Sequence, residues 1–371
     1  MIIAIGVDAH KETSSAYAVY AGEGKENDKH KGFLNQFNKE FGQFPSTPLE
    51  MQRLSAFVRG HECHVLLENS TKTHDVYWIL KNLGFNVTVA QANELYRITE
   101  SDKKTDRNDS MELAGYMRRR LHGEKEFAEC FIPSPEWMTK REMCRGLSAE
   151  KVYLANTKRR IRAHLLLHGI GLNKEYSDIT CKSAMNELGR IKDPYLMMQL
   201  KFASDAKSRI YFGEKAVWQM FHGDPMYRGI YSIVGFGIVS SAYFTSLIVD
   251  IGRFPTCSNF EASFGVVPRK RSSGEHDPNC RTTHKGDELA REMLKHCARV
   301  HVRCDEDSVV TKMYKRLVAR GKAKTEALIA AGRKLLTVMW AVLKSGKPYT
   351  SDPEKLMAAR NMAEEDETLT E

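Results

Sequence analysis

Two aspartates three residues apart, Asp106 and Asp109, lie in the charged stretch 103–110 (KKTDRNDS). Good helix formers follow, so a helix that begins near residue 105 places both carboxylates on one face of its first turn. Two such carboxylates can share a hard divalent cation through their oxygen atoms. The alternative interpretation is a helix N-cap within a solvated run of charges. The remaining ligands of a metal site must come from elsewhere in the chain.

Two further acids each follow a short apolar run. Residues 1–7 (MIIAIGV) lead to Asp8, and residues 65–67 (VLL) lead to Glu68. Continuous apolar runs of this length predict buried strands that carry an acid at their ends. Four carboxylates gathered at one sheet edge would repel one another unless cations neutralised them. Asp8, Glu68, Asp106 and Asp109 are therefore the predicted ligands of Mg²⁺, with Mn²⁺ as an alternative, in a two-metal phosphoryl-transfer site.

The elements needed to position these acids alternate along the first 128 residues. We expect strands over 1–7, 14–20, 65–67 and 87–90, and helices over 51–59, 74–83 and 105–121. The first two strands are expected to pair antiparallel. This order predicts an α/β domain with a partly parallel sheet over residues 1–128. Residues 22–49 are polar and contain Gly, Asn and Lys, and we interpret them as an insertion or a long loop.

Residues 129–222 are predicted to form a helical domain. Pro133 and Pro135 mark its start, and helical spacing runs over 137–167 and 194–221. Two long helices that return on each other indicate a hairpin or a dimerising coiled coil. The first carries an excess of cations, which favours phosphate contacts over a merely solvated face. Its candidate nucleic-acid-binding residues are Arg145, Arg159, Arg160 and Arg162.

Residues 223–350 form a third predicted domain, with helices over 242–251, 287–303, 311–317 and 324–343. The Gly235–Gly237 turn could present backbone N–H groups to a phosphate or simply join two helices. The segment 265–274 (GVVPRKRSSG) places Ser272 and Ser273 after three consecutive cations. A hydroxyl group beside cations is a candidate nucleophile for attack on phosphate, although such a segment can also be an ordinary loop.

Composition bounds the class of protein. The 371 residues leave room for two or three domains, and the net charge of +9 with a pI near 9.0 points to a polyanionic partner, nucleic acid before membrane. Eight scattered cysteines without a CxxC pair favour a reducing compartment. With no leader and no membrane-length apolar run, we expect a cytoplasmic, nucleoid-associated protein. The acidic tail, 351–371, is expected to be disordered.

Three pieces of the chain, 5–11 (IGVDAHK), 67–70 (LENS) and 104–109 (KTDRND), resemble a family of insertion-sequence transposases described as bridge-RNA-guided recombinases. The resemblance implies a ribonuclease H-like (RuvC-like) N-terminal domain in which Asp8, Glu68, Asp106 and Asp109 form a DEDD tetrad. It also implies a coiled-coil middle and a mainly helical C-terminal domain. That last domain carries a catalytic serine in a Ser-Gly or Ser-x-Gly loop before a Lys-Gly pair. Ser272 and Ser273 both fit that pattern.

The same resemblance implies a DNA transposase or site-specific recombinase that acts on donor and target duplex DNA. It further implies a structured guide RNA and a homo-oligomer, dimeric or tetrameric. The expected nucleic-acid contacts are Lys104, Arg107, Arg145, Arg159, Arg160, Arg162, Arg269, Lys270, Arg271 and Lys285.

Three other functions would make different demands on the sequence. A structure-specific, Holliday-junction-type endonuclease would use the acids alone, with water as nucleophile. A sugar or acetate kinase would need glycine-rich phosphate loops after its strands, which are absent from the sequence. In an inactive nucleic-acid-binding protein, replacement of Asp8 by Asn would have no effect on any DNA chemistry.

Overall fold

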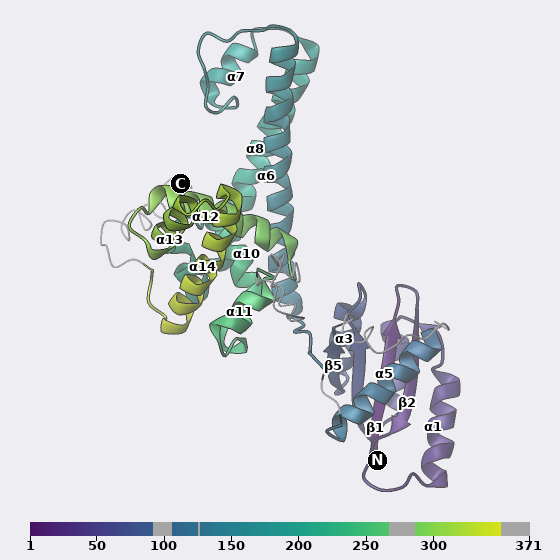
Figure 1. The fold of residues 1–371 in the computed structure, drawn as a ribbon. Coiled ribbons are helices and arrows are strands. Elements are labelled where there is room, and N and C mark those ends of the chain that lie inside the picture. Colours follow the sequence, from purple (N-terminus) through teal and green to yellow (C-terminus); the bar gives the residue numbers. More distant parts are fainter. Residues whose placement is uncertain (92–105, 125–126, 267–285, 350–371) are drawn as a thin grey trace. The chain divides into compact units, whose positions relative to one another are not determined.

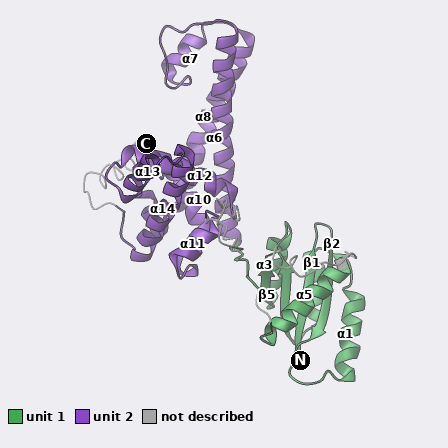
Figure 2. Ribbon diagram, viewed as in Figure 1, with its two compact units in different colours: residues 1–134 green, residues 135–371 purple. Residues whose placement is uncertain are grey.

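The structure is a computed structural model that describes residues 1–91, 106–124, 127–266 and 286–349, with backbone only for Asp106. The chain divides into two compact units, Met1–Ser134 and Pro135–Glu371 (Figure 2). No helix in the described part of either unit is both long and apolar enough to cross a membrane.

The first unit is built on a five-stranded sheet with the order β3-β2-β1-β4-β5 (Figure 1). The strands are β1 (Ile2–Ala9), β2 (Thr13–Tyr20), β3 (Phe44–Pro45), β4 (Glu62–Glu68) and β5 (Asn86–Ala90). β1 pairs parallel with β4, and β4 pairs parallel with β5, whereas β2 runs antiparallel to both of its neighbours. The predicted α/β architecture with a partly parallel sheet is therefore confirmed.

The two faces of the sheet carry side chains of different size. Ile3, Ile5 and Val7 of β1 belong to a core that includes α1 (Asp28–Glu40), α2 (Pro48–Phe57) and α3 (Thr73–Asn82). Ala4 belongs to a second core, with α5 (Asp106–Leu121) on the opposite face. Because strand side chains alternate, large residues face one layer of helices and small residues leave room for α5.

Of the two interpretations of residues 22–49, an insertion or a long loop, the long loop is wrong. These residues contain α1 and β3. Leu34, Phe37 and Phe41 recur at helical spacing and are buried against the sheet, and the side chain of Asn27 accepts a hydrogen bond from the His30 N–H as an N-cap. The apolar stripe is short within a polar sequence, so burial against the sheet stabilises this helix more than its own composition does.

The last residues of the first unit extend beyond position 128. The N–H of Cys130 donates to the Val89 carbonyl at 2.8 Å, and Trp78 Nε1 donates to the Pro133 carbonyl at 2.9 Å. The first bond attaches this segment to the edge of the sheet at β5, and the second attaches it to α3. The unit boundary at 134 therefore differs by six residues from the division expected at 128.

The second unit begins with two long helices that pack on each other. These are α6 (Pro135–Leu167) and α8 (Pro194–Phe221), with the short α7 (Lys182–Leu188) at their tip (Figure 1). Ile161, Leu165 and Leu196 share a small core at the tip, and ion pairs such as Lys151–Glu214 at 2.5 Å link the two helices. Of the two arrangements expected from the sequence, the structure shows a hairpin within one chain.

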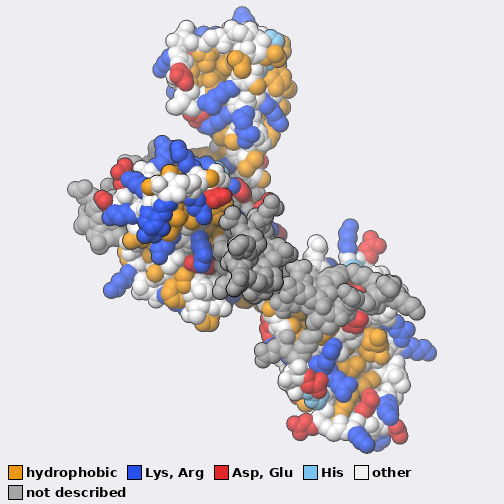
Figure 3. Space-filling view, viewed as in Figure 1, with side chains coloured by type: hydrophobic (Ala, Val, Ile, Leu, Met, Phe, Trp, Pro, Cys, Tyr) orange, Lys and Arg blue, Asp and Glu red, His pale blue; other side chains and the backbone are white. Residues whose placement is uncertain are grey.

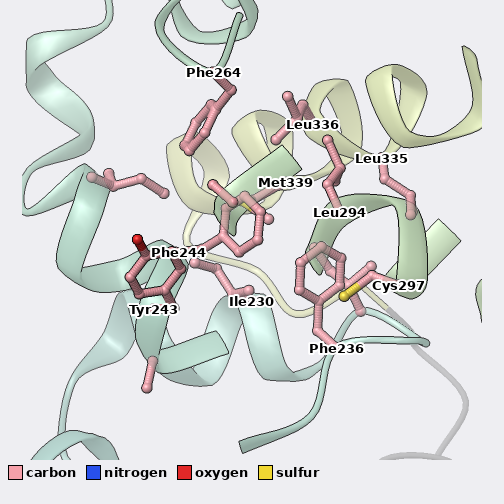
Figure 4. Close-up of a cluster of buried hydrophobic side chains, with 14 of the residues drawn as sticks. Ile230, Phe236, Tyr243, Phe244, Phe264, Leu294, Cys297, Leu335, Leu336 and Met339 are labelled. Carbon is pink, nitrogen blue, oxygen red and sulfur yellow. The ribbon is translucent and has the colours of Figure 1, made fainter. Parts of the chain in front are cut away.

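The remaining helices form a bundle around the base of the hairpin. They are α9 (Pro225–Tyr231), α10 (Ile238–Ile248), the short 3₁₀ helix η1 (Ile251–Arg253), α11 (Cys257–Ser263), α12 (Glu288–Cys304), α13 (Val309–Ala319) and α14 (Lys324–Ser345). Their core includes Phe236, Phe244, Leu294 and Leu335 (Figure 4). The helices predicted for residues 242–343 are thus present, with ends shifted by a few residues.

The glycine turn before α10 has a packing role. Gly235 has φ +99°, and a Cβ atom added there would lie 2.5 Å from the Cys297 carbonyl oxygen of α12. The N–H of Gly237 donates to Ser240 Oγ at 2.9 Å, which caps α10. The turn therefore has the geometry of a helix junction in which only glycine permits the close approach of α12.

Candidate acidic site and nucleic-acid interface

The parallel pairing of β1 and β4 places two of the predicted acids at one edge. The register pairs Val7 with Leu67, so Asp8 and Glu68 follow as the next residues at the carboxyl ends of adjacent strands. The Asp8 side chain is 13% exposed, and Glu68 is half-buried. Two carboxylates from separate stretches of the sequence thus end at the same edge of the sheet.

Helix α5 begins over that same edge. A Cβ atom on Gly6 would lie 2.1 Å from the Ser110 carbonyl oxygen, so the helix backbone lies directly on β1. Ser110 Oγ lies 3.0 Å from Ser15 Oγ, and Ser15 pairs with Asp8 across the β1–β2 ladder. The first turn of α5, which carries Asp109, is therefore close to the end of β1. A helix N-terminus also favours nearby carboxylates through its partial positive charge.

Asp106 is the first residue of α5, and its side chain lies outside the described residues. Among the described side chains, no three His, Cys, Asp or Glu residues are close enough together to hold a metal ion. The acids at this edge offer carboxylate oxygens, the ligands that suit Mg²⁺ or Mn²⁺ rather than a soft metal. The donor chemistry of Asp8, Glu68 and Asp109 therefore fits the predicted ion.

Two residues near these acids were not singled out from the sequence. His10 Nε2 lies 3.2 Å from Asp8 Oδ2. Glu112 follows Asp109 by three residues on α5, and burial, followed by the charge of Asp109, raises the pKa of its carboxyl group. The helical spacing of Asp109 and Glu112 was visible in the sequence, but only the structure shows that Glu112 is half-buried.

The candidate nucleophiles Ser272 and Ser273, with Arg269, Lys270, Arg271 and Lys285, lie outside the described residues. The described chain stops at Val266, which is buried just after α11, and resumes at Gly286. Gly286 has φ +97°, and a Cβ atom there would lie 2.5 Å from the Ser263 carbonyl oxygen. The residues on either side of the serine segment therefore lie next to each other in the helical unit.

Asp287 anchors the returning end of this segment. Its Oδ1 accepts hydrogen bonds from the Ala290 N–H at 2.9 Å and the Tyr243 hydroxyl at 2.7 Å, while Oδ2 accepts one from Arg145 at 2.5 Å. Burial raises the pKa of Asp287, but these hydrogen bonds outweigh that effect and leave its pKa lowered. Arg145, expected to contact nucleic acid, is thus engaged within the protein, although half of its side chain remains exposed.

The other predicted cations occupy different places. Arg107 is exposed in the first turn of α5, and Lys104 lies outside the described residues. Arg159 and Arg160 are exposed on α6, and Arg162 donates to the Ser177 carbonyl at 2.9 Å. Figure 3 shows Lys and Arg side chains gathered on the face of the hairpin tip. This basic surface is available to phosphate groups.

Part of the second unit is similar to a known protein family. Residues 227–314 match the family described as Transposase IS116/IS110/IS902 family. The "Putative transposase y4qE" of Sinorhizobium fredii is 22% identical over 302 residues, which cover 75% of this chain and 74% of the relative. The family match over residues 227–314 contains the positions of both candidate serines.

Two other relatives align over shorter stretches. The "Insertion element IS900 uncharacterized 42 kDa protein" of Mycobacterium paratuberculosis is 31% identical over 124 residues, 32% of this chain and 30% of the relative. The "Transposase for insertion sequence element IS1111A" of Coxiella burnetii is 25% identical over 121 residues, 32% of this chain and 33% of the relative. The relatives that this chain resembles thus include proteins named as transposases, one of them of an insertion sequence element.

Proposed function

We propose that this protein is an insertion-sequence transposase that cuts and rejoins DNA strands through a serine nucleophile assisted by an acidic metal site. The observation that carries the proposal is the family match over residues 227–314, which spans Ser272 and Ser273. The acids that end β1 and β4, with the first turn of α5 packed beside them, support the second half of the proposal.

In the proposed reaction, the Oγ of Ser272 or Ser273 attacks a backbone phosphorus atom. An Oγ–P bond forms as a P–O bond of the strand breaks, and the released strand end takes up the serine proton as a hydroxyl group. A 3′-hydroxyl of a second strand then attacks the phosphoserine ester and releases the serine. Because each step exchanges one ester for another, the cycle needs no ATP.

Asp8, Glu68, Asp106 and Asp109 would hold Mg²⁺, or Mn²⁺ in its place. When bound, the ion supplies Lewis-acid polarisation of the phosphate. The chain's own contribution is to fix the carboxylates on two strands and one helix, which hold them more rigidly than a loop could. The strand order, with β2 alone antiparallel, supports a ribonuclease H-like domain as the source of this arrangement.

The proposed partners are donor and target duplex DNA, a structured guide RNA and further copies of the chain. The exposed arginines Arg159 and Arg160 on α6 support binding of a phosphate backbone, which both nucleic acids share. Assembly of several copies would allow the acids of one chain and the serine of another to act on the same strand.

The test uses full-length protein, a plasmid bearing the element and a target plasmid. The double variant Ser272→Ala with Ser273→Ala and the single variant Asp8→Asn should each abolish strand transfer. Each should also abolish the covalent protein–DNA adduct, because the proposed attack needs both a serine hydroxyl group and the acidic metal site. Arg316→Gln, an exposed change on α13, serves as the folded control. Strand transfer that persists without both serines would overturn the nucleophile assignment.

One observation favours a second candidate function. Asp8, Glu68 and Asp109 all belong to the first compact unit, whereas the candidate serines belong to the second. A metal-dependent, Holliday-junction-type endonuclease would need only this unit, with water as nucleophile. In that case the serine double variant would keep full cleavage of a four-way junction, while Asp8→Asn would lose it.

A further inference from the structure

Two arginines of α6, Arg141 and Arg145, and one of η1, Arg253, donate hydrogen bonds to residues of α10. Arg141 donates to the Ser246 carbonyl at 2.9 Å, and Arg145 Nε donates to the Tyr243 hydroxyl at 3.0 Å. Arg253 donates to the carbonyl oxygens of Ile248 at 2.6 Å and Leu247 at 3.3 Å. All three guanidinium groups therefore donate to acceptors within residues 243–248, the last residues of α10.

Positive charge accumulates at this turn. Burial, and then the neighbouring Arg141, lowers the pKa of Arg253 to about 10, and burial followed by Arg145 lowers the pKa of Arg141. Two carboxylates oppose the three cations. Asp287 is bound to Arg145, and Asp250 is exposed and accepts the N–H of Gly252 at 2.7 Å. The three guanidinium groups and two carboxylates of the described residues thus share a partly desolvated place.

Arg141 also has a donor without an acceptor. Its Nε is buried and has no hydrogen-bond partner, although its terminal nitrogen reaches Ser246. A buried N–H of a charged group is costly when it is unpaired, and such a group indicates an acceptor that belongs to a bound ligand or water. A guanidinium group pairs best with a planar fork of oxygens, as in a phosphate or carboxylate.

The backbone beside the arginines is strained. Val249 has φ +60° and ψ −48°, and the Asp250 N–H donates to the Ile248 carbonyl at 2.6 Å, which defines a γ-turn. Positive φ is unfavourable for a β-branched residue, and such strain concentrates where a ligand is held. Val249 is half-buried and Asp250 is exposed, so the turn reaches the surface.

A purely structural explanation covers part of this arrangement. Cations stabilise the C-terminus of a helix, and Arg253 satisfies two carbonyls at the end of α10 in this way. That role leaves the Arg141 Nε without an acceptor and gives no reason for the strained turn. An anion with several oxygen atoms would supply the acceptor that Arg141 Nε lacks.

We propose that Arg141, Arg145 and Arg253 bind one phosphate of the DNA backbone at the end of α10. The site rests on the proposed transposase function for its ligand, since DNA is the substrate of strand transfer. Arg145 links the site to Asp287, which precedes α12, so a phosphate bound here would lie near the point where the chain returns from the serine segment. These arginines are positioning residues for the DNA.

The experiment measures binding of the full-length protein to a fluorescent DNA duplex by anisotropy, in EDTA and over a series of KCl concentrations. EDTA removes divalent metal, so affinity is read without strand cleavage. Arg141→Gln and Arg253→Gln should each weaken DNA binding about tenfold. Each should also make the slope of log binding constant against log KCl concentration shallower by about one, as expected for one lost phosphate contact. Arg316→Gln, with an exposed arginine on α13, is the matched control and should show neither change.

Folding is checked by circular dichroism and thermal melting. If Arg141→Gln does not fold, Arg141→Lys and Arg253→Gln are measured in its place. Arg141→Lys should bind DNA more weakly but keep the wild-type dependence of affinity on salt, because lysine keeps the positive charge. The proposal is overturned if these variants bind DNA with wild-type affinity, or if they lose no more affinity than Arg316→Gln does. It is also overturned if the wild-type protein does not bind DNA.

An RNA duplex of the same sequence is the second arm. A loss on DNA alone or on both duplexes supports the DNA phosphate site, whereas a loss on RNA alone contradicts it. Affinity loss in the arginine variants together with no strand transfer by the wild-type protein would retain the phosphate site and refute the proposed function.

Discussion

Gly6 of β1 and Ser110 of α5 are in direct backbone contact. A Cβ atom at Gly6 would lie 2.1 Å from the Ser110 carbonyl oxygen and 2.4 Å from the Ala114 nitrogen. These neighbours are backbone atoms, so they cannot move aside as a flexible side chain could. The distance between α5 and the sheet, and with it the place of the first turn of α5 over β1, depends on the absence of one side chain.

Gly6→Ala should therefore destabilise the first unit by about 2–4 kcal/mol, because the added methyl group must push α5 from the sheet. Chemical denaturation followed by circular dichroism measures the free energy of unfolding. The control is Gly115→Ala, on α5 itself, where an added Cβ meets nothing within 4 Å. That change should raise stability by about 0.5–1 kcal/mol through helix propensity. Equal effects of the two substitutions would contradict the packing described.

The stability of the second unit should depend on pH through His301. This residue is fully buried on α12, where its Nδ1 lies 2.7 Å from the Val234 carbonyl oxygen and its Nε2 lies 2.8 Å from Ser308 Oγ. Burial lowers the pKa of His301 below its usual value of 6.5. The unfolded chain then binds the proton more tightly, so stability is fully present above pH 6.5 and is lost as the pH falls from 6.5 through the lower folded pKa.

Thermal melting between about pH 5 and pH 8 measures this effect. His301→Gln should lower the melting temperature at pH 8 and flatten its decline at acid pH. His296→Gln, an exposed change on the same helix, should leave the wild-type profile in place. An unchanged acid decline in His301→Gln would assign the pH dependence to other groups.

Cys181 should be the most reactive of the described cysteines toward thiol reagents at neutral pH. A hydrogen bond with Ser183, followed by one from the Ala184 N–H at the start of α7, lowers the pKa of its thiol group. Burial raises the pKa of Cys297 and Cys144, each to about 12. Because the thiolate is the reactive species, limited alkylation followed by peptide mass spectrometry should find Cys181 modified first. Earlier modification of Cys297 would contradict the buried position of that thiol.

Helix α8 should take part in self-association. Phe212 is 67% exposed and Tyr211 is 49% exposed, on a helix that also leaves Met197 and Met198 in contact with solvent. A series of exposed apolar side chains on one helix is typical of a protein contact surface. The double variant Tyr211→Ser with Phe212→Ser should reduce the mass measured by light scattering. Val309→Ser, an exposed apolar change on α13, should not.

The sequence alone predicted much of the secondary structure. Helix α8 spans the predicted range, because Pro194 follows the N-cap Asp193 and apolar residues recur at helical spacing. The apolar runs before Asp8 and Glu68 likewise predicted two strands, and parallel pairing accounts for their common edge. Such signals are local: they depend on caps, prolines and periodicity within one element. The metal, the serine nucleophile and the guide RNA remain proposals.

The tertiary structure decided what residues distant in sequence do together. Helix α1 was interpreted as loop because its stripe of Leu34 and Phe37 is stabilised by a sheet that the local sequence does not contain. Arg141 and Arg253 have no pattern that links them, and they meet because α6 crosses the end of α10. Local sequence encodes the elements, whereas shared environments arise only when separate elements pack, and burial then changes what each side chain can bind.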